Sequence, residues 1–276
     1  MMRGSRWVPW MAVGLWFTSG LSMAVAYGIG IRHLVWSQMA GHHPMASLFW
    51  MIQAEGVVTA VFWWRVVRSL WRRRRSRIQL ARQVMPLLRR LDVESLHPGL
   101  SSHIQWYLSP DMERYAFSWG WRSPRAVISR GLWMALTKDE RAAVLFHEQH
   151  HLFVHDPLWQ ELLSVVVDTL PLKSFRNLFR SYLKDREIRA DWAAVKAFGG
   201  QREPLAAAMW AVVQDVGRVP AYANVSKWAG SLDARIDYLV SGHTPSGVGA
   251  NWAGLASPSL LPIFLAVGQG LLLWCR

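Results

Sequence analysis

Three long apolar segments dominate the pattern of hydrophobic and polar positions along the chain. Residues 8–31 contain no charged side chain, and residues 46–64 are interrupted only by Gln53 and Glu55. Residues 253–275 are also apolar, although two prolines interrupt them. Each segment is long enough to cross a hydrocarbon core about 30 Å thick. The pattern therefore predicts about three transmembrane helices.

Between the second and third apolar segments, the spacing of hydrophobic residues predicts a mainly helical α+β fold. Strand-like composition predicts a small antiparallel sheet from three segments, 103–108, 114–119 and 125–129. Helical spacing predicts helices at 76–95, 138–154, 174–198 and 203–216. The expected domains are an N-terminal transmembrane hairpin over 1–67 (helices at about 8–31 and 46–67), a domain over 68–250, and a C-terminal transmembrane helix over 251–276.

The arginines predict the orientation of the chain in the membrane. Seven arginines lie within residues 65–77, whereas the loop 32–45 carries only Arg32. Because cationic loops remain on the cytoplasmic side, the N-terminus and the 68–250 domain are expected in the cytoplasm and the C-terminus outside. Residues 8–31 also fit a cleaved signal peptide, since Ala24-Val-Ala26 resembles a cleavage site.

The overall charge fits a membrane surface. The chain has 31 lysines and arginines against 18 aspartates and glutamates, a formal net charge of +13. A basic cluster next to a membrane-spanning segment is attracted to anionic lipid, so the charge requires no direct nucleic acid partner. The expected partner is a lipid bilayer, and homodimer formation is left open. The single cysteine excludes an internal disulfide.

The most specific motif is His-Glu-Gln-His-His at residues 147–151. A helix places His147 and His151 on one face, where both imidazoles reach one metal ion. Glu148 then lies beside that ion, where a general base accepts a proton from water. Thr137 and Glu140 form a capping box at the start of the same helix. The motif predicts a Zn²⁺ site with Glu148 as the catalytic base.

Two histidines leave a tetrahedral zinc ion one protein ligand short. Glu187 and Asp191 lie four residues apart on a predicted helix. Either carboxylate can complete the site while the other accepts the ring N–H of a liganding histidine. In the alternative interpretation these acids form a solvated face, paired with the neighbouring cations Lys184, Arg186 and Arg189.

HExxH followed by ExxxD resembles the gluzincin arrangement, and the flanking sequence resembles the membrane zinc peptidases of the BlaR/MecR antirepressor type. The similar segments are His151 to Leu158, Ala126 to Leu132, Leu136 to Glu140 and Leu232 to Leu239, and the match covers about residues 100–242. Residues 224–231 lack the His-Pro of related heat-shock and prenyl-protein proteases, which favours the antirepressor type.

The resemblance implies a membrane-anchored, gluzincin-like zinc endopeptidase that hydrolyses peptide bonds on the cytoplasmic side of the cell membrane. Carried over by position, it implies His147, His151 and Glu187 as zinc ligands and Glu148 as catalytic base. Asp191 would orient a liganding histidine. The implied protein substrate is a cytosolic transcriptional repressor. The chain ends just after its third apolar segment, so no external ligand-binding domain of the sensor type is expected.

A fourth apolar segment, residues 157–172, is not expected to cross the membrane. A single crossing there would place His147 and Glu187 on opposite sides, and two crossings need far more residues. Glu161 and Asp168 also make exposure to lipid costly. The segment is therefore expected to be a buried core helix or to dip into the membrane surface and return.

Several side chains and functions remain as alternatives. Arg235, Tyr238 and His243 are candidates for oxyanion or substrate binding, although Arg235 alternatively pairs with a structural carboxylate. His150 and His155 are interpreted as surface histidines on the same helix as the motif. The other functions considered are a quality-control protease for membrane proteins and a non-catalytic signalling or scaffold protein that retains a zinc site. The intact general base argues against the non-catalytic alternative.

Overall fold

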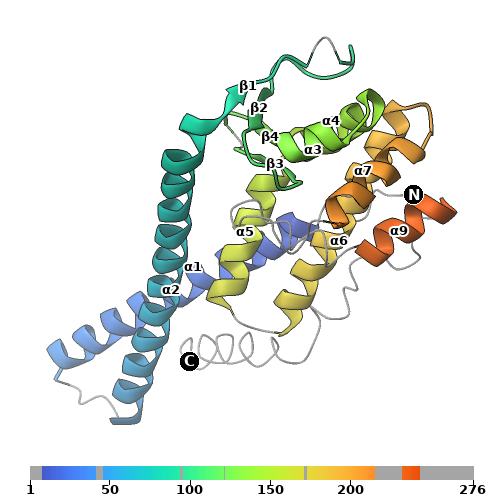
Figure 1. The fold of residues 1–276 in the computed structure, drawn as a ribbon. Coiled ribbons are helices and arrows are strands. Elements are labelled where there is room, and N and C mark those ends of the chain that lie inside the picture. Colours follow the sequence, from blue (N-terminus) through green and yellow to red (C-terminus); the bar gives the residue numbers. More distant parts are fainter. Residues whose placement is uncertain are drawn as a thin grey trace. The chain divides into compact units, whose positions relative to one another are not determined.

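The computed structural model describes residues 8–41, 46–93, 96–120, 122–170, 173–214 and 232–242. The chain divides into two compact units. The first unit contains Met1–Arg74, Leu162–Phe179 and Asn251–Arg276, and the second contains Arg75–Glu161 and Arg180–Ala250. Figure 1 labels the helices and strands in chain order, and most of them are helices, as predicted.

Two long helices, α1 (Val8–Met39) and α2 (Ala46–Val84), form most of the first unit. They approach closely where glycines remove a side chain: a Cβ at Gly56 would lie 2.6 Å from the Tyr27 ring, and one at Gly20 would lie 2.7 Å from Phe62. Small residues at such positions let helix backbones pack tightly.

The predicted spans 8–31 and 46–67 fall within these two helices. Over the described residues, no helix combines the length and the hydropathy needed to cross a bilayer. The third span, over 251–276, lies outside the described residues. The three transmembrane helices therefore stay a prediction.

The prediction of a helix over 76–95 is wrong beyond residue 84. Helix α2 ends at Val84, a 3₁₀ turn follows at Met85–Leu87, and strand β1 (Arg89–Arg90) comes next. Pro86 explains the change, because proline has no N–H to donate within a helix and disfavours helical backbone in the residue before it. The prediction of a helix over 76–95 therefore missed β1, an edge strand of the sheet.

The sheet has four strands rather than three, and it is mixed rather than antiparallel. Strands β2 (Gln105–Ser109), β3 (Ala116–Trp119) and β4 (Arg125–Ser129) occupy the predicted segments, but the order is β1-β2-β4-β3. Strand β4 pairs parallel to β2 and antiparallel to β3. Burial explains this order, because β4 is the most deeply buried strand and takes the centre, while the exposed arginines of β1 lie at an edge.

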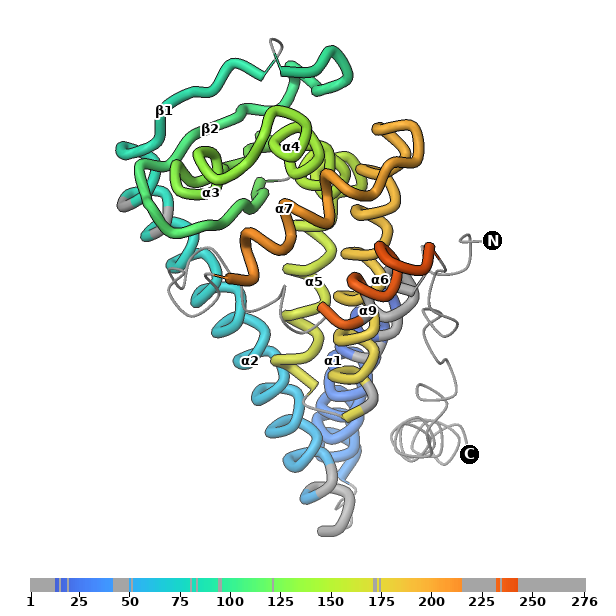
Figure 2. Tube along the Cα trace, turned by 45° about the vertical axis from the view of Figure 1, so that its right-hand side comes forward, coloured from blue at the N-terminus to red at the C-terminus, as the bar shows by residue number. Residues whose placement is uncertain are grey.

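Helix α4 (Lys138–Phe153) lies at the centre of the second unit, close to the predicted bounds 138–154. It follows the short helix α3 (Arg130–Ala135) and contacts β3, β4 and α7 (Glu203–Val213). Figure 2 shows α4 beside α3 and α7. Its residues Ala143, Val144 and Leu145 enter the main hydrophobic core. The helix that carries the HExxH motif is therefore packed against the sheet and against α7.

The remaining helices bring the other functional residues to α4. They are α5 (Asp156–Thr169), α6 (Lys173–Ala197) and α9 (Leu232–Ser241). Helix α6 agrees with the prediction of 174–198 and ends before Gly199 and Gly200, whose φ angles of 63° and 97° suit glycine at a helix end. Residues 157–172 form α5 over most of their length. Contact of that segment with the membrane surface stays a prediction.

Candidate metal centre

The start of α4 holds the motif helix in place. The Thr137 hydroxyl accepts a hydrogen bond from the Glu140 N–H, and the Glu140 carboxylate accepts one from the Thr137 N–H at 2.9 Å. This is the predicted capping box, which satisfies two N–H groups that a helix start leaves without partners. Ten residues later, His147, Glu148 and His151 all lie buried on this helix.

A sharp turn after α4 brings the start of α5 next to the histidines. His155 has a φ of 57°, in the left-handed region that non-glycine residues seldom adopt. Helix α5 begins at the next residue, and this reversal directs Asp156 back toward α4. The Asp156 carboxylate lies 2.7 Å from Nδ1 of His151 and accepts a hydrogen bond from Tyr182 of α6 at 2.9 Å.

Two imidazoles and one carboxylate converge in the second unit. The Nε2 atoms of His147 and His151 lie 3.1 Å apart. Glu187, from α6, places one carboxylate oxygen 3.5 Å from His147 Nε2 and the other 3.8 Å from His151 Nε2. Among the described residues, this buried trio is the group of histidine, cysteine and acidic residues whose atoms are close enough to hold a metal ion.

The separation of these atoms fits a shared cation. Two ligands bound to one zinc ion at about 2.0–2.1 Å with tetrahedral angles lie about 3.3 Å apart. The separations of 3.1, 3.5 and 3.8 Å bracket that value. The trio therefore fits a metal ion without a large rearrangement of the helices.

The outer nitrogens of the imidazoles favour the same conclusion. Nδ1 of His147 lies 2.9 Å from the Asp191 carboxylate, and Nδ1 of His151 lies 2.7 Å from that of Asp156. A carboxylate next to Nδ1 keeps the proton on that nitrogen, so a neutral ring has its lone pair on Nε2. Both lone pairs then point into the space that the two rings share with Glu187.

The charge of the cluster also favours a divalent cation. Four buried carboxylates surround the histidines: Glu148, Asp156, Glu187 and Asp191. Two buried guanidinium groups, Arg186 and Arg235, face them. With neutral histidines the cluster keeps two negative charges, and burying them without a counter-ion is costly.

The pKa shifts have the same origin. Burial lowers the pKa of His147, but its interactions with Asp191 and Glu187 outweigh burial and raise that pKa to about 9. Burial raises the pKa of Glu187, but Arg186 and His151 hold it well below its usual value. Without a metal ion, the negative potential of the site therefore retains a proton on His147.

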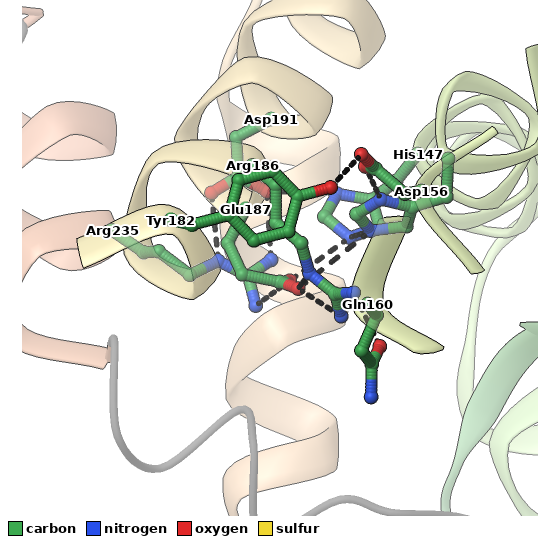
Figure 3. A network of polar contacts seen from close by, with 9 residues as sticks. His147, Asp156, Gln160, Tyr182, Arg186, Glu187, Asp191 and Arg235 are labelled. Atoms are coloured by element: carbon green, nitrogen blue, oxygen red, sulfur yellow. Dashed lines mark hydrogen bonds and ion pairs between the residues drawn. The ribbon is translucent and has the colours of Figure 1, made fainter. Parts of the chain in front are cut away.

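Two arginines, Arg235 and Arg186, pair with the carboxylates of Asp191 and Glu187 (Figure 3). Arg235, on α9, donates from Nε and from a terminal nitrogen to the two oxygens of Asp191, each at 2.7 Å. Arg186 donates from Nε and a terminal nitrogen to one oxygen of Glu187, each at 3.0 Å. Both arginines are buried, so these charges are little screened by water.

Among the oxyanion candidates, the structure favours the alternative interpretation of Arg235. Its guanidinium is fully buried against Asp191, which makes it a structural partner rather than a group facing a substrate. Tyr238 is also buried and packs in the hydrophobic core. His243 lies outside the described residues. These candidates therefore leave the oxyanion stabiliser unidentified.

The neighbouring histidines differ from the interpretation as two surface residues of one helix. His155 is exposed but lies in the turn after α4, and His150 is partly buried on α4. Burial lowers the pKa of His150 to about 4, and the nearby His151 adds to this effect. The solvated-face interpretation of Glu187 and Asp191 is wrong, because both acids are buried.

Sequence reasoning assigned no role to Asp156, Gln160 or Tyr182. Asp156 belongs to the segment after the HExxH motif that carried part of the family resemblance, and that was the available signal. Tyr182 had no such signal, because only the packing of α6 places its hydroxyl against Asp156. Arg186 was expected only as a surface ion-pair partner, yet it is buried beside Glu187.

Comparison with known proteins assigns this site to one kind of enzyme. The sequence model described as BlaR1 peptidase M56 matches residues 31–239 of the chain. The matched region includes the HExxH motif, Glu187, Asp191 and Arg235. Among curated proteins, none matches this chain significantly.

Proposed function

The chain belongs to the BlaR1 peptidase M56 family, and we propose that it is an integral-membrane zinc endopeptidase that cleaves a protein substrate on the cytoplasmic side. One observation carries the proposal. The Nε2 atoms of His147 and His151 converge with the Glu187 carboxylate in a buried, negatively charged site, next in sequence to Glu148.

The donor set favours zinc. Two imidazoles and one carboxylate are a common catalytic zinc set, which leaves a fourth position for water or substrate. His147, His151 and Glu187 would hold the ion. When bound, zinc polarises the scissile carbonyl and lowers the pKa of a water molecule.

The protein's own residues supply the proton transfers and the orientation. Glu148 accepts a proton from the water whose oxygen attacks the carbonyl carbon, and delivers it to the amine nitrogen as the C–N bond breaks. Asp156 and Asp191 hold the rings of His151 and His147, so the Nε2 atoms keep their direction during the reaction.

Replacing Glu148 with glutamine tests the peptidase proposal. Peptide cleavage should fall by a factor of about 10² or more, because general acid–base catalysis contributes about 10²–10⁴-fold. Zinc content should stay the same, since Glu148 is not among the proposed ligands. Glu203→Gln, at an exposed position, is the matched control and should keep full activity. Full cleavage by E148Q would refute the mechanism.

The membrane part of the proposal is supported by the surface of α2. Val57, Val58 and Val61 are exposed along one stretch of this helix, and Trp64 and Trp71 are exposed further along it. The exposed valines, the tryptophans interleaved with Arg65 and Arg68, and the run Arg72–Arg75 follow in the order of the core, interface and cytoplasmic surface of a bilayer. The Arg68 guanidinium lies 5.0 Å from the Trp64 ring, a contact suited to the interface.

Phosphatase fusions test the proposed topology, in which the N-terminus and the 68–250 domain are cytoplasmic and the C-terminus is outside. A phosphatase that is active only after export should be active when fused after residue 276 and inactive when fused after residue 250. Equal activity at both positions would contradict a third span over 251–276.

The proposed substrate is a cytosolic transcriptional repressor, a choice supported by the similarity to antirepressor peptidases. Deleting the gene, or producing only E148Q, should leave a small set of transcripts repressed and one DNA-binding protein uncleaved. Broad accumulation of damaged membrane proteins would instead favour the quality-control alternative.

A further inference from the structure

Arg186 adopts a position that helix geometry does not require. Successive residues of an α-helix point about 100° apart, so neighbouring side chains do not normally meet. Arg186 nevertheless turns back onto Glu187, with Nε and a terminal nitrogen each 3.0 Å from the same carboxylate oxygen. The guanidinium is buried there, so the contact is not a loose surface ion pair.

A second helix holds the guanidinium in this position. The other terminal nitrogen of Arg186 donates to the side-chain oxygen of Gln160, on α5, at 2.5 Å (Figure 3). Nε and one terminal nitrogen of Arg186 therefore bind Glu187, and the other terminal nitrogen binds Gln160. Because the guanidinium is planar, fixing both sides also fixes its orientation.

The two carboxylate oxygens of Glu187 have different partners. Oε1 accepts both hydrogen bonds from Arg186. Oε2 is buried, accepts no hydrogen bond within the described part of the chain, and lies 3.5 Å from His147 Nε2 and 3.5 Å from a terminal nitrogen of Arg235. An ion pair at this distance without a hydrogen bond compensates a buried carboxylate oxygen only in part, so a closer cation would stabilise Oε2.

We propose that Arg186, held by Gln160, is a positioning residue that fixes Glu187 as a metal ligand by engaging Oε1, the oxygen that faces His151, so that Oε2 is directed toward His147. This inference rests on the proposed metal site. It gives α5 a double role, because its first turns supply Asp156 to orient His151 and Gln160 to orient Arg186. Two of the three proposed ligands then depend on the placement of one helix.

A double-mutant cycle on metal affinity tests the proposal in the full-length protein. The variants are R186Q, Q160L and their combination, with R180Q as control, because Arg180 is exposed on the same helix. Zinc dissociation constants come from chelator competition, and the visible spectrum of the Co²⁺-loaded protein reports ligand geometry. R186Q should weaken zinc binding by about 10–100-fold, as loss of a residue that orients a ligand usually does.

If Gln160 acts on Glu187 through Arg186, the variants should show a specific pattern of zinc affinities. Q160L should weaken binding by less than R186Q and alter the Co²⁺ spectrum in the same direction. The combined variant should bind zinc no more weakly than R186Q alone, because Gln160 acts only through the arginine. R186K should bind zinc more tightly than R186Q but less tightly than the wild type, since lysine keeps the positive charge but lacks the planar, two-nitrogen geometry of the guanidinium.

Two results would overturn the inference. The first is a wild-type zinc affinity and Co²⁺ spectrum in R186Q, even if its unfolding temperature falls in chelator. The second is additive losses in the cycle. If R186Q does not fold, Q160L and R186K decide by the same two readouts. Wild-type protein that binds no zinc would instead refute the proposed function, and the role of Arg186 with it.

Discussion

Replacing Arg235 with methionine should destabilise the fold, because its partner would stay buried without it. Arg235 and Asp191 are both fully buried and share two hydrogen bonds of 2.7 Å. A third nitrogen of Arg235 lies 3.5 Å from Glu187. Methionine fills much of the volume but leaves the Asp191 carboxylate with the His147 ring as its remaining charged partner. Breaking a buried pair in this way costs about 3–5 kcal/mol.

Thermal unfolding in the presence of a chelator measures this loss without a contribution from bound metal. For domains of 150–250 residues each kcal/mol shifts Tm by about 2–4 °C, so R235M should unfold about 6–20 °C below the wild type. R235K should recover part of the loss, because lysine restores the charge without the bidentate geometry. R130M, at an exposed position, should change stability by no more than about 0.5 kcal/mol.

If R235M unfolds at the wild-type temperature and binds zinc normally, yet loses peptide cleavage, the guanidinium acts on the substrate. Arg235 would then be the oxyanion donor, and its burial against Asp191 would not describe its role.

Three further predictions concern the scaffold. Thr137→Ala should lower the unfolding free energy by about 1 kcal/mol in denaturant titration, through loss of the cap, while Thr137→Ser should not. Gly131→Ala should cost about 1–3 kcal/mol or more in the same assay, because its Cβ would lie 1.8 Å from the Met112 carbonyl oxygen; a wild-type midpoint would contradict this. Burial raises the pKa of Asp185 to about 7, against the opposing effect of Arg189, from an unperturbed 3.8. Because the folded-state pKa is the higher one, wild-type stability in chelator should fall relative to Asp185→Asn as pH rises from 3.8 through about 7, and a pH-independent difference would contradict it.

The local features of the fold were predictable because they depend on short sequence spacing. The capping box set the start of α4, and the two glycines after residue 198 set the end of α6. The four-residue spacing of His147 and His151 placed both rings on one helix face. Strand composition located three of the four strands.

Features that depend on which segments meet could not be obtained in this way. Strand order is one example, since parallel and antiparallel pairing use the same strand residues, and the deep burial of β4 favoured the centre of the sheet. The edge strand β1 was missed because it consists of two exposed arginines, which carry no hydrophobic pattern.

The same division applies to the metal centre. The two histidines, the general base and a choice between two carboxylates for the third ligand could be read from the sequence alone. Helix packing then selected the ligand, because it places Glu187 against both Nε2 atoms and Asp191 against Nδ1 of His147. It also brought Asp156 and Gln160 of α5, and Tyr182 of α6, to the site. The physical reason is that helical spacing determines which residues share a face, whereas the packing of α4, α5, α6 and α9 determines which faces meet and which buried charges must be compensated.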